Sequence, residues 1–538
     1  MKISRREAIR MGLMGSGAFL LPSVWANPVW AACNSQIPPY NPPFSSQNPP
    51  FSPQIPVFQQ SFRTPPVLQP AHSDASTDYY EIVVKPSQIE MLPGRQTPIW
   101  SYNGITPGPT IRQKCGRQSV VRFINYLEGP TVTHLHGMAS LPQYDGHPND
   151  LIPPNHYKDY IYPNTWASTF WYHDHTIHYT SRNVYAGLAG IYIVEDDFEK
   201  SLNLPKGNYD IPLIIQDKKF TNDGQLVFND LGSRGSYGDV ILVNGVPWPK
   251  MEVANRKYRF RVLNAGASRT YQLSLSTGDD LIMIATDAGL RDKPVYTKTL
   301  RIAMAERYGF IIDFSKYPIG TKVVLQNQVL PVNIDTDARS QNVMCFEVVR
   351  EEKDDSTIPD NLRPFTPIEV NDKTPQRTFR FERNQGLWKI NNKTWNCEVA
   401  DYKPKLGDIE IWNLVNTGGG WIHPVHIHLL DWQILSRNGV PPLPYERGWK
   451  DTFYVGENQT VKVATKFDPG YACAGRYVMH CHNLPHEDHD MMTQFEVGEG
   501  GLSPLSAMAK QLPAPPFKDG LYSPQQGYCA EAGCRSNK

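Results

Sequence analysis

The stretch HCHNLPHEDHDMM at residues 480–492 decides how this chain must fold. In it a single cysteine lies between two histidines, and more histidines and two methionines follow within a few residues. A thiolate, an imidazole and a weak thioether together favour a trigonal copper site for electron transfer, whereas structural zinc sites use four Cys or His ligands in a closed tetrahedron. Cys481, His486 and Met491 can supply three such ligands.

The alternation of side chains along a strand gives the same stretch a second role. Residues 477–484 begin with a β-prone aromatic and aliphatic run, so we expect them to be extended. Cys481 then points to one face of the strand, and His480 and His482 point to the other. The two imidazoles start about 6 to 7 Å apart, roughly two strand rises, which suits one ligand for each of two neighbouring metal ions. The backbone of Cys481 would connect the two metal sites.

Three other segments carry histidines at positions i and i+2, the spacing that places both side chains on one face of a strand. The pairs are His134 with His136, His173 with His175, and His426 with His428. His423 is an odd number of residues from both histidines of the last pair, so it faces the opposite side and can join Cys481. One such pair alone is more often structural than ligating, but four pairs beside an HCH motif indicate a large metal centre.

In combination these stretches resemble a known family. HLHG at 134–137, WYHDH at 171–175, HPVHIHL at 423–429 and the stretch at 480–492 are similar to motifs of the three-domain multicopper oxidases, among them bilirubin oxidases and bacterial spore-coat laccases. The resemblance covers about residues 78–498. It implies an all-β fold of three cupredoxin-like Greek-key β-sandwich domains.

The resemblance also assigns ligands for four copper ions per chain. The type 1 copper would be bound by His423, Cys481, His486 and the axial Met491. The type 2 copper would be bound by His134 and His426, and the type 3 pair by His136, His173, His175, His428, His480 and His482. The sequence leaves open whether His489 replaces His486 and whether Met492 replaces Met491.

The implied reaction is one-electron oxidation of small organic donors, such as bilirubin or phenols, with four electrons used to reduce dioxygen to water. The reduction consumes protons, and the resemblance places Asp145 and Glu487 near the oxygen site as their source. Asp145 with Gly146 is also an ordinary turn signal, and Glu487 could instead orient a ligand. Trp421 has the parity to lie beside the type 1 copper and admit electrons, although a core tryptophan fits the sequence equally well.

Three rival functions remain to be weighed. A copper carrier would need the cysteine site but no set of four histidine pairs, and a nitrite reductase of the two-domain type would not require all four. A cuprous oxidase usually has a methionine-rich insert, whereas the 13 methionines here are scattered. We therefore favour oxidation of organic donors, with a metal oxidase or a non-catalytic copper-binding protein as the alternatives.

The length of 538 residues is too great for one core and suggests several domains. An asparagine turn followed by a strand occurs at 103–125, 244–264 and 391–413, which predicts three copies of one β-sandwich. The expected order is an export signal (1–26), a proline-rich extension (27–75), a first domain with trinuclear ligands (76–204), a middle domain without copper ligands (205–360), a last domain with type 1 and trinuclear ligands (361–500) and a tail (501–538). The middle domain would be a spacer whose surface could shape a substrate pocket.

The first residues resemble an export signal rather than part of a folded domain. Basic residues precede an apolar run of about 13 to 15 residues, which fits an export signal of twin-arginine type and is short of the roughly 20 residues that span a bilayer. We expect a periplasmic or extracellular protein without an integral membrane segment. The proline-rich repeat of NPPFS at 41–45 and 48–52 favours a passive linker over a docking segment.

Charge and cysteine content add two expectations. Lys plus Arg and Asp plus Glu both total 53, so no net basic field exists to attract nucleic acid. The sequence does not define an oligomeric state, and a monomer is the working expectation. The 8 cysteines leave an odd number after Cys481, so one should be free or removed with the leader, and Cys529 with Cys534 could close a small loop. The residues that precede Cys33 match a lipid-attachment site poorly.

Overall fold

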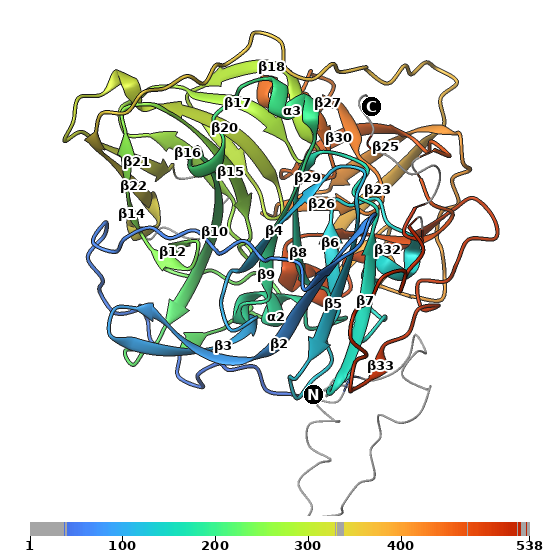
Figure 1. The fold of residues 1–538 in the computed structure, drawn as a ribbon. Coiled ribbons are helices and arrows are strands. Elements are labelled where there is room, and N and C mark those ends of the chain that lie inside the picture. Colours follow the sequence, from blue (N-terminus) through green and yellow to red (C-terminus); the bar gives the residue numbers. More distant parts are fainter. Residues whose placement is uncertain are drawn as a thin grey trace, which may run out of the picture.

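The computed structural model describes residue 37, residues 40–328, residue 330, residues 338–470, residues 472–524, residues 526–528 and residue 534. In this part of the chain most strands belong to six sheets, and each successive third of the sequence supplies two of them. Figure 1 shows these sheets gathered around a centre where early, middle and late strands meet. The predicted all-β fold of three sandwiches is confirmed, whereas the domain boundaries stay predictions.

The first sandwich packs the sheet β1-β2-β5-β7, with β3 beside β2, against the sheet β4-β9-β8-β6. Its strands are β1 (His72–Ser73), β2 (Thr77–Leu92), β3 (Arg95–Tyr102), β4 (Gly108–Lys114), β5 (Gln118–Asn125), β6 (Thr133–His136), β7 (His156–Tyr162), β8 (Ser168–Asp174) and β9 (Ala189–Glu195). Two short helices accompany them, α2 (Thr180–Ala186) and α3 (Asp197–Ser201).

The middle sandwich packs the sheet β13-β12-β10-β15-β20-β17-β18, with β11 beside β10, against the sheet β14-β22-β21-β16-β19. Its strands are β10 (Asp210–Phe220), β11 (Leu226–Val227), β12 (Val240–Val243), β13 (Val246–Pro247), β14 (Lys250–Ala254), β15 (Lys257–Asn264), β16 (Tyr271–Leu275), β17 (Leu281–Thr286), β18 (Gly289–Thr297), β19 (Leu300–Ile302), β20 (Arg307–Asp313), β21 (Lys322–Asn327) and β22 (Asn342–Arg350).

The last sandwich packs the sheet β24-β23-β25-β30-β27-β28 against the sheet β29-β26-β31-β32. Its strands are β23 (Gln376–Asn384), β24 (Leu387–Ile390), β25 (Ile409–Asn416), β26 (His423–Ile427), β27 (Trp432–Arg437), β28 (Trp449–Lys450), β29 (Thr452–Val455), β30 (Thr460–Lys466), β31 (Gly475–Cys481) and β32 (Met492–Val497). Between its last two strands lies the short helix α4 (Leu484–Asp488).

The internal repeat has a common turn at its start. Asn103, Asn244 and Asn391 all adopt a left-handed backbone, with φ of 56°, 51° and 52°, a conformation that asparagine tolerates better than most residues. Each side-chain oxygen accepts a hydrogen bond of 2.7 or 2.8 Å from a backbone N–H of a neighbouring strand. The same residue type therefore performs the same task in all three sandwiches.

The repeat also has a common end, which differs in one place from the prediction. Asn125, Asn264 and Asn416 are the last residues of β5, β15 and β25, and each side-chain amide donates hydrogen bonds to two backbone carbonyls beyond the strand. The third copy was predicted to end at Asn413, but β25 continues for three more residues, to Asn416. The correct equivalent is Asn416.

The hydrophobic core of the middle sandwich continues into its neighbours. Trp171 and Val184 of the first sandwich and Leu484 of α4 belong to the same buried cluster as the middle strands. Separate clusters fill the first and the last sandwich. The apolar contact of α4 with the middle sandwich fixes the helix that follows the HCH motif.

The proline-rich segment is packed onto the body rather than free. Isolated bridges join Phe44 to Leu226 and Ser61 to Lys250, and the ring of Tyr40 stacks on Tyr179 with centroids 4.4 Å apart. The interpretation as a passive linker is therefore wrong for this part. The predicted leader at 1–26 lies outside the described residues.

The tail returns to the first sandwich. Its strand β33 (Lys510–Gln511) pairs with the edge strand β7, and Cys534 forms a disulfide with Cys115. The proposed pairing of Cys534 with Cys529 is therefore wrong, because the tail lies against a sandwich that is distant in sequence. Cys345 and Cys481 are the free cysteines in the described part of the chain, and both are buried.

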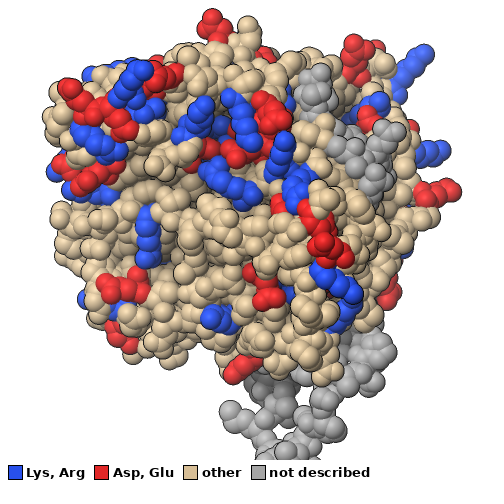
Figure 2. Space-filling view, in the orientation of Figure 1, with Lys and Arg blue, Asp and Glu red and all other residues tan. Residues whose placement is uncertain are grey.

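Among the described residues no helix has the length and apolar character needed to cross a bilayer. On the face shown in Figure 2, basic and acidic side chains lie beside one another without a large area of one sign.

Candidate metal centre

Histidines of the first and last sandwiches meet at one buried place. In the first sandwich β6 pairs with β8, so that His134 lies opposite His173. In the last sandwich β26 pairs with β31, so that His426 lies opposite His480. The Nε2 atoms of His134 and His426 are 3.4 Å apart. Figure 1 shows the strands that carry them, β6 and β26, close to one another in the middle of the molecule. The two ends of the fold therefore close on one another as the sequence predicted.

The eight paired histidines form three groups, two of which share His136, and the ring nitrogens within each group lie within 4.8 Å of one another. The groups are His134 with His136 and His426, His136 with His173 and His482, and His175 with His428 and His480. His480 and His482 thus join different groups, as their spacing in the sequence predicted. All eight side chains are buried.

Two carboxyl groups contact the third histidine group, His175 with His428 and His480, on the side away from its centre. The Nε2 atom of His480 lies 3.3 Å from those of His175 and His428, so these three nitrogens face one another. On the opposite side of the rings, Nδ1 of His428 donates a hydrogen bond of 2.7 Å to Asp145 Oδ2. Glu487 places Oε2 2.9 Å from Nδ1 of His480 and Oε1 3.4 Å from Nδ1 of His175. Both predicted carboxylates therefore contact histidines of this group directly.

Burial controls the protonation of these carboxyl groups. It raises the pKa of Asp145 well above its ordinary value. It also raises the pKa of Glu487 to about 7. Asp145 and Gly146 also form the turn that the sequence indicated. Gly146 has φ of 79°, and a Cβ there would lie 2.4 Å from the Thr133 carbonyl oxygen. The turn is what brings Asp145 against the histidines.

The histidine groups have the properties of metal sites. Burial is the largest cause of a lowered pKa for every histidine in the three groups, so their imidazoles are neutral. Nδ1 of His136, Nε2 of His173 and both ring nitrogens of His482 are buried without a hydrogen-bond partner. Buried polar atoms are rarely left unpaired, and neutral imidazoles are the form that binds metal. The donor set fits bound copper.

The cysteine site lies on the other side of the same strand. Cys481 Sγ is 3.4 Å from Nδ1 of His423 and 3.7 Å from Nδ1 of His486, and these two nitrogens are 3.3 Å apart. Met491 is fully buried in the same apolar cluster as Cys481. Burial raises the pKa of the Cys481 thiol, and coordination to a metal is the usual way to obtain a buried thiolate.

The geometry separates the alternatives that the sequence left open. His489 lies away from the sulfur, with Nε2 3.4 Å from Asp230 and a side chain that is 28% exposed. Met492 packs in another cluster, with Ile177 and Val478. His486 and Met491 are therefore the residues placed beside Cys481.

One expectation about this stretch was wrong. The strand was predicted to extend through residue 484, but β31 ends at Cys481 and α4 begins at Leu484. Pro485 stands in the first turn of that helix, a position where its missing N–H costs nothing. The helix turns the chain back and carries His486 to the sulfur.

Two tryptophans lie against the cysteine site. The partly buried Trp421 meets His486 edge-on, with ring centroids 6.1 Å apart, so it lies on the predicted side. Trp388 stacks on His486 with centroids 3.7 Å apart and an angle of 26°. Trp388 could not be predicted from the sequence, since a single tryptophan in a hairpin has no distinctive spacing.

The middle sandwich contributes to both sites, so the description of it as a spacer was wrong. The Arg234 carbonyl lies 3.3 Å from Nε2 of His486 and can accept a hydrogen bond from it. Ser268 donates a hydrogen bond of 2.8 Å to Asn483, which follows the HCH motif. Arg307 forms an ion pair with Asp451, which contacts His136. None of these residues belongs to a short motif that the sequence could have revealed.

The fold and the two centres define a copper oxidase built from β-sandwiches. Family models described as multicopper oxidase match residues 83–199, 215–346 and 367–501, and the chain belongs to the multicopper oxidase family. The histidine groups and the cysteine site fit a trinuclear and a type 1 copper site.

Known relatives agree with this assignment. The chain is 40% identical over 483 residues to a bilirubin oxidase of Albifimbria verrucaria, covering 84% of this chain and 82% of the relative. It is 35% identical over 514 residues to a laccase of Bacillus subtilis (strain 168), covering 82% and 98%. The solved structure of the McoA multicopper oxidase from Aquifex aeolicus matches with a TM-score of 0.76 and 31% identity, covering 82% of this chain and all of that one.

Proposed function

We propose that this multicopper oxidase couples one-electron oxidation of small organic donors to four-electron reduction of dioxygen to water, using four copper ions per chain. His423, Cys481, His486 and Met491 would hold the type 1 ion, and His134 and His426 the type 2 ion. His136, His173 and His482 would hold one type 3 ion, and His175, His428 and His480 the other. When bound, copper supplies single-electron acceptance at the first site and oxygen reduction at the other.

The placement of Cys481 between His480 and His482 is the observation that carries this proposal. Its side chain belongs to one site, while its two neighbours belong to different groups of the other. The Cys481 carbonyl oxygen also lies 3.4 Å from Nδ1 of His480. A few covalent bonds and this contact therefore link the place where an electron arrives with the place where oxygen is reduced.

Asp145 and Glu487 are proposed to hold and deliver the protons that oxygen reduction consumes. Both are buried beside histidines of one group, and burial raises the pKa of both carboxyl groups. A carboxyl group that stays protonated near neutral pH can act as a general acid. Their contacts with imidazole Nδ1 atoms also allow them to orient ligands, and the two roles are compatible.

The donor is proposed to be a bulky organic molecule such as bilirubin or a phenol. Relatives named bilirubin oxidase and laccase support this class. Trp421, partly buried against the His486 ring, is proposed as the surface on which the donor rests. The 13 methionines are scattered along the sequence and form no methionine-rich insert, which favours organic donors over cuprous ion.

We also propose that the protein acts outside the cytoplasm, as a monomer and without a nucleic-acid partner. The disulfide between Cys115 and Cys534 is typical of oxidising compartments, and the leader-like start of the sequence agrees with export. The intermixed charges in Figure 2 offer no basic surface for a polyanion on that face.

The decisive experiment measures copper per chain and oxygen uptake on the same copper-loaded preparation, with bilirubin, a hindered phenol and cuprous ion as separate donors. We expect about four copper ions per chain, as three histidine groups and one cysteine site require. Uptake should be fastest with bilirubin or the phenol. The matched control is Cys481→Ser, which should abolish the blue colour and the uptake.

The other outcomes distinguish the rivals. About one copper per chain without oxygen uptake would indicate a carrier. Fastest uptake with cuprous ion would indicate a metal oxidase. Blue colour retained in Cys481→Ser would reject the assignment of the type 1 site.

A further inference from the structure

Asp451 touches two of the candidate copper ligands. Its Oδ1 lies 3.0 Å from Nε2 of His136, and its backbone carbonyl lies 2.9 Å from Nδ1 of His426. The hydroxyl of Thr452 is also 3.0 Å from Nε2 of His136. An ionised carboxylate accepts hydrogen bonds only, so Nε2 of His136 must carry the proton in this contact.

The position of that proton decides which nitrogen of His136 can bind metal. A neutral imidazole has one N–H and one lone pair, so a protonated Nε2 leaves the lone pair on Nδ1. Nδ1 of His136 is buried and has no hydrogen-bond partner in the described structure. The ring also belongs to the group with His173 and His482. With Nε2 held by Asp451, Nδ1 is the nitrogen of His136 that is left to bind metal.

Arg307, from the start of β20 in the middle sandwich, holds Asp451 in place. Its two terminal nitrogens lie 2.6 Å from the two carboxylate oxygens, a bidentate pair. Its remaining guanidinium hydrogen bonds go to the backbone carbonyls of Thr169 (3.1 Å), Ala305 (3.3 Å) and Asp287 (3.1 Å). All five N–H groups are thereby paired, and the guanidinium joins residues of all three sandwiches.

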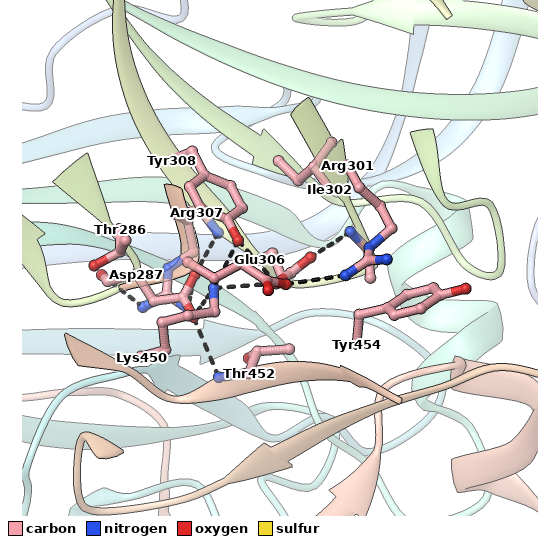
Figure 3. A network of polar contacts seen from close by, with 12 residues as sticks. Thr286, Asp287, Arg301, Ile302, Glu306, Arg307, Tyr308, Lys450, Thr452 and Tyr454 are labelled. Carbon is pink, nitrogen blue, oxygen red and sulfur yellow. Dashed lines mark hydrogen bonds and ion pairs between the residues drawn. The ribbon is translucent and has the colours of Figure 1, made fainter. Parts of the chain in front are cut away.

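A second pair of charges fixes the backbone around Asp451. Asp287 Oδ1 accepts a hydrogen bond of 2.7 Å from the Arg307 backbone N–H, and Lys450 Nζ lies 2.8 Å from Asp287 Oδ2. The same Oδ2 is 3.3 Å from the backbone nitrogens of Asp451 and Thr452. Figure 3 shows Asp287, Arg307, Lys450 and Thr452 converging in this network. The middle sandwich thus holds this segment through the side chain of Asp451 and through the backbone of Asp451 and Thr452.

The glycine of the HLHG motif leaves room for the pair. Gly137, next to His136, has φ of 93°, and a Cβ there would lie 2.6 Å from an Arg307 terminal nitrogen and 2.8 Å from Asp451 Oδ2. The ion pair therefore packs directly against the backbone that carries the ligand. A side chain at this position would displace either the pair or the strand.

We propose that Arg307 is a positioning residue of the trinuclear centre: by clamping Asp451 it sets which ring nitrogen of His136 faces the metal. The middle sandwich, which holds no copper ligand, would then determine copper binding at a centre formed by the other two. This inference rests on the proposed trinuclear site. It extends that proposal because it makes metal binding depend on a residue outside both ligand-bearing sandwiches.

The test compares Arg307→Gln and Arg307→Lys with a matched control, Arg301→Gln. Arg301 also pairs across the interface between the middle and last sandwiches, 3.0 Å from Glu446 and over the ring of Tyr454, but it does not contact Asp451. Each variant is loaded with copper, and three quantities are measured: copper per chain, the type 2 electron paramagnetic resonance spectrum, and the blue absorption of the type 1 site. Thermal unfolding is followed alongside.

We expect Arg307→Gln to lose copper from the histidine groups and to change the type 2 spectrum, with the blue absorption per chain retained. Arg307→Lys keeps the charge but not the bidentate fork, so it should show a smaller loss, and it serves if the glutamine variant does not fold. Arg301→Gln should keep all signals of the parent. Parental copper content and type 2 spectrum in both Arg307 variants would overturn the inference, as would an equal loss in Arg301→Gln. A parent without trinuclear copper would instead overturn the proposed function.

Discussion

The indole of Trp388 covers the imidazole of His486, with ring centroids 3.7 Å apart and an angle of 26° between the planes. Trp388 is fully buried, and its Nε1 donates a hydrogen bond of 2.8 Å to the carbonyl of Ser233 in the middle sandwich. One side chain thus excludes water from a candidate copper ligand and ties two sandwiches together. The outer shell of a metal site controls its solvent access and hence its potential.

Replacing Trp388 should therefore affect both stability and the type 1 site. We expect Trp388→Ala to lower the free energy of unfolding by about 3 to 5 kcal/mol, the usual cost of such a cavity, and to change the potential of the type 1 copper. Trp388→Phe keeps the stacked ring and loses only the N–H donor, so its potential should stay close to that of the parent. Urea unfolding and redox titration of the blue absorption measure the two effects. Equal potentials in all three proteins would contradict the shielding role.

Adjacent methionines offer a matched pair of substitutions at the same site. Met491 lies in the cluster of Cys481, whereas Met492 packs with Ile177 and Val478. Met491→Leu removes a weak axial donor that stabilises the oxidised copper, so the type 1 potential should rise while copper stays bound. Met492→Leu should leave the potential unchanged. Both exchanges conserve volume and should cost less than about 1.5 kcal/mol.

Redox titration of the two methionine variants decides between these positions. An unchanged potential in Met491→Leu would reject Met491 as the axial ligand. A rise in Met492→Leu instead would transfer the assignment to Met492.

Asp145→Asn should slow oxygen reduction while copper is retained. The asparagine can still accept the hydrogen bond from Nδ1 of His428, so the ligand keeps its orientation, but the side chain no longer carries an acidic proton. Loss of a general acid costs roughly 10²- to 10⁴-fold in rate. Stopped-flow reoxidation of the reduced protein by oxygen measures this step, and anaerobic reduction of the type 1 copper by a phenol serves as the control. Parental reoxidation at every pH would leave Asp145 with only an orienting role.

The ligand set could be predicted from the sequence because its geometry is local. A spacing of two residues places two imidazoles on one strand face, and the HCH motif divides its side chains between two faces. The three asparagine turns could be found because the same residue type recurs before a strand in each sandwich, although the N–H group that each side chain binds lies 11 to 30 residues away. For the histidines, the local strand geometry itself brings the groups to their places.

The remaining features depend on packing between distant segments. Arg307 reaches Asp451 only because the middle sandwich docks against the last, and Cys115 meets Cys534 across 419 residues. The end of β31 was misplaced because the alternating pattern continues past Cys481, whereas the helix that contains Pro485 packs through Leu484 against the middle core. A single sequence does not specify such contacts, since no short motif records them.

Stability of the metal-free protein should fall as the pH drops below about 6.5. Burial lowers the pKa of the candidate ligand histidines, to about 3 for His173, His423, His426 and His480. Between these values and the ordinary pKa of about 6.5, the unfolded chain binds more protons than the folded one, so the free energy of unfolding decreases with falling pH. Each such histidine contributes a loss of about 2 kcal/mol at pH 5.

Buried carboxyl groups with a raised pKa stabilise the folded state as the pH falls, but the histidines with a lowered pKa outnumber them. Glu487, with its pKa raised to about 7, favours the folded state as the pH falls through 7. Urea unfolding of the metal-free protein at pH 7.5 and pH 5 should therefore give a much lower midpoint at pH 5. Glu487→Gln should make the fall steeper, because it removes an opposing group. In the copper-loaded control the fall should begin at lower pH, since bound copper keeps the histidines neutral and stabilises only the folded state. Equal midpoints at both pH values in the metal-free protein would show that these histidines are not held neutral by burial.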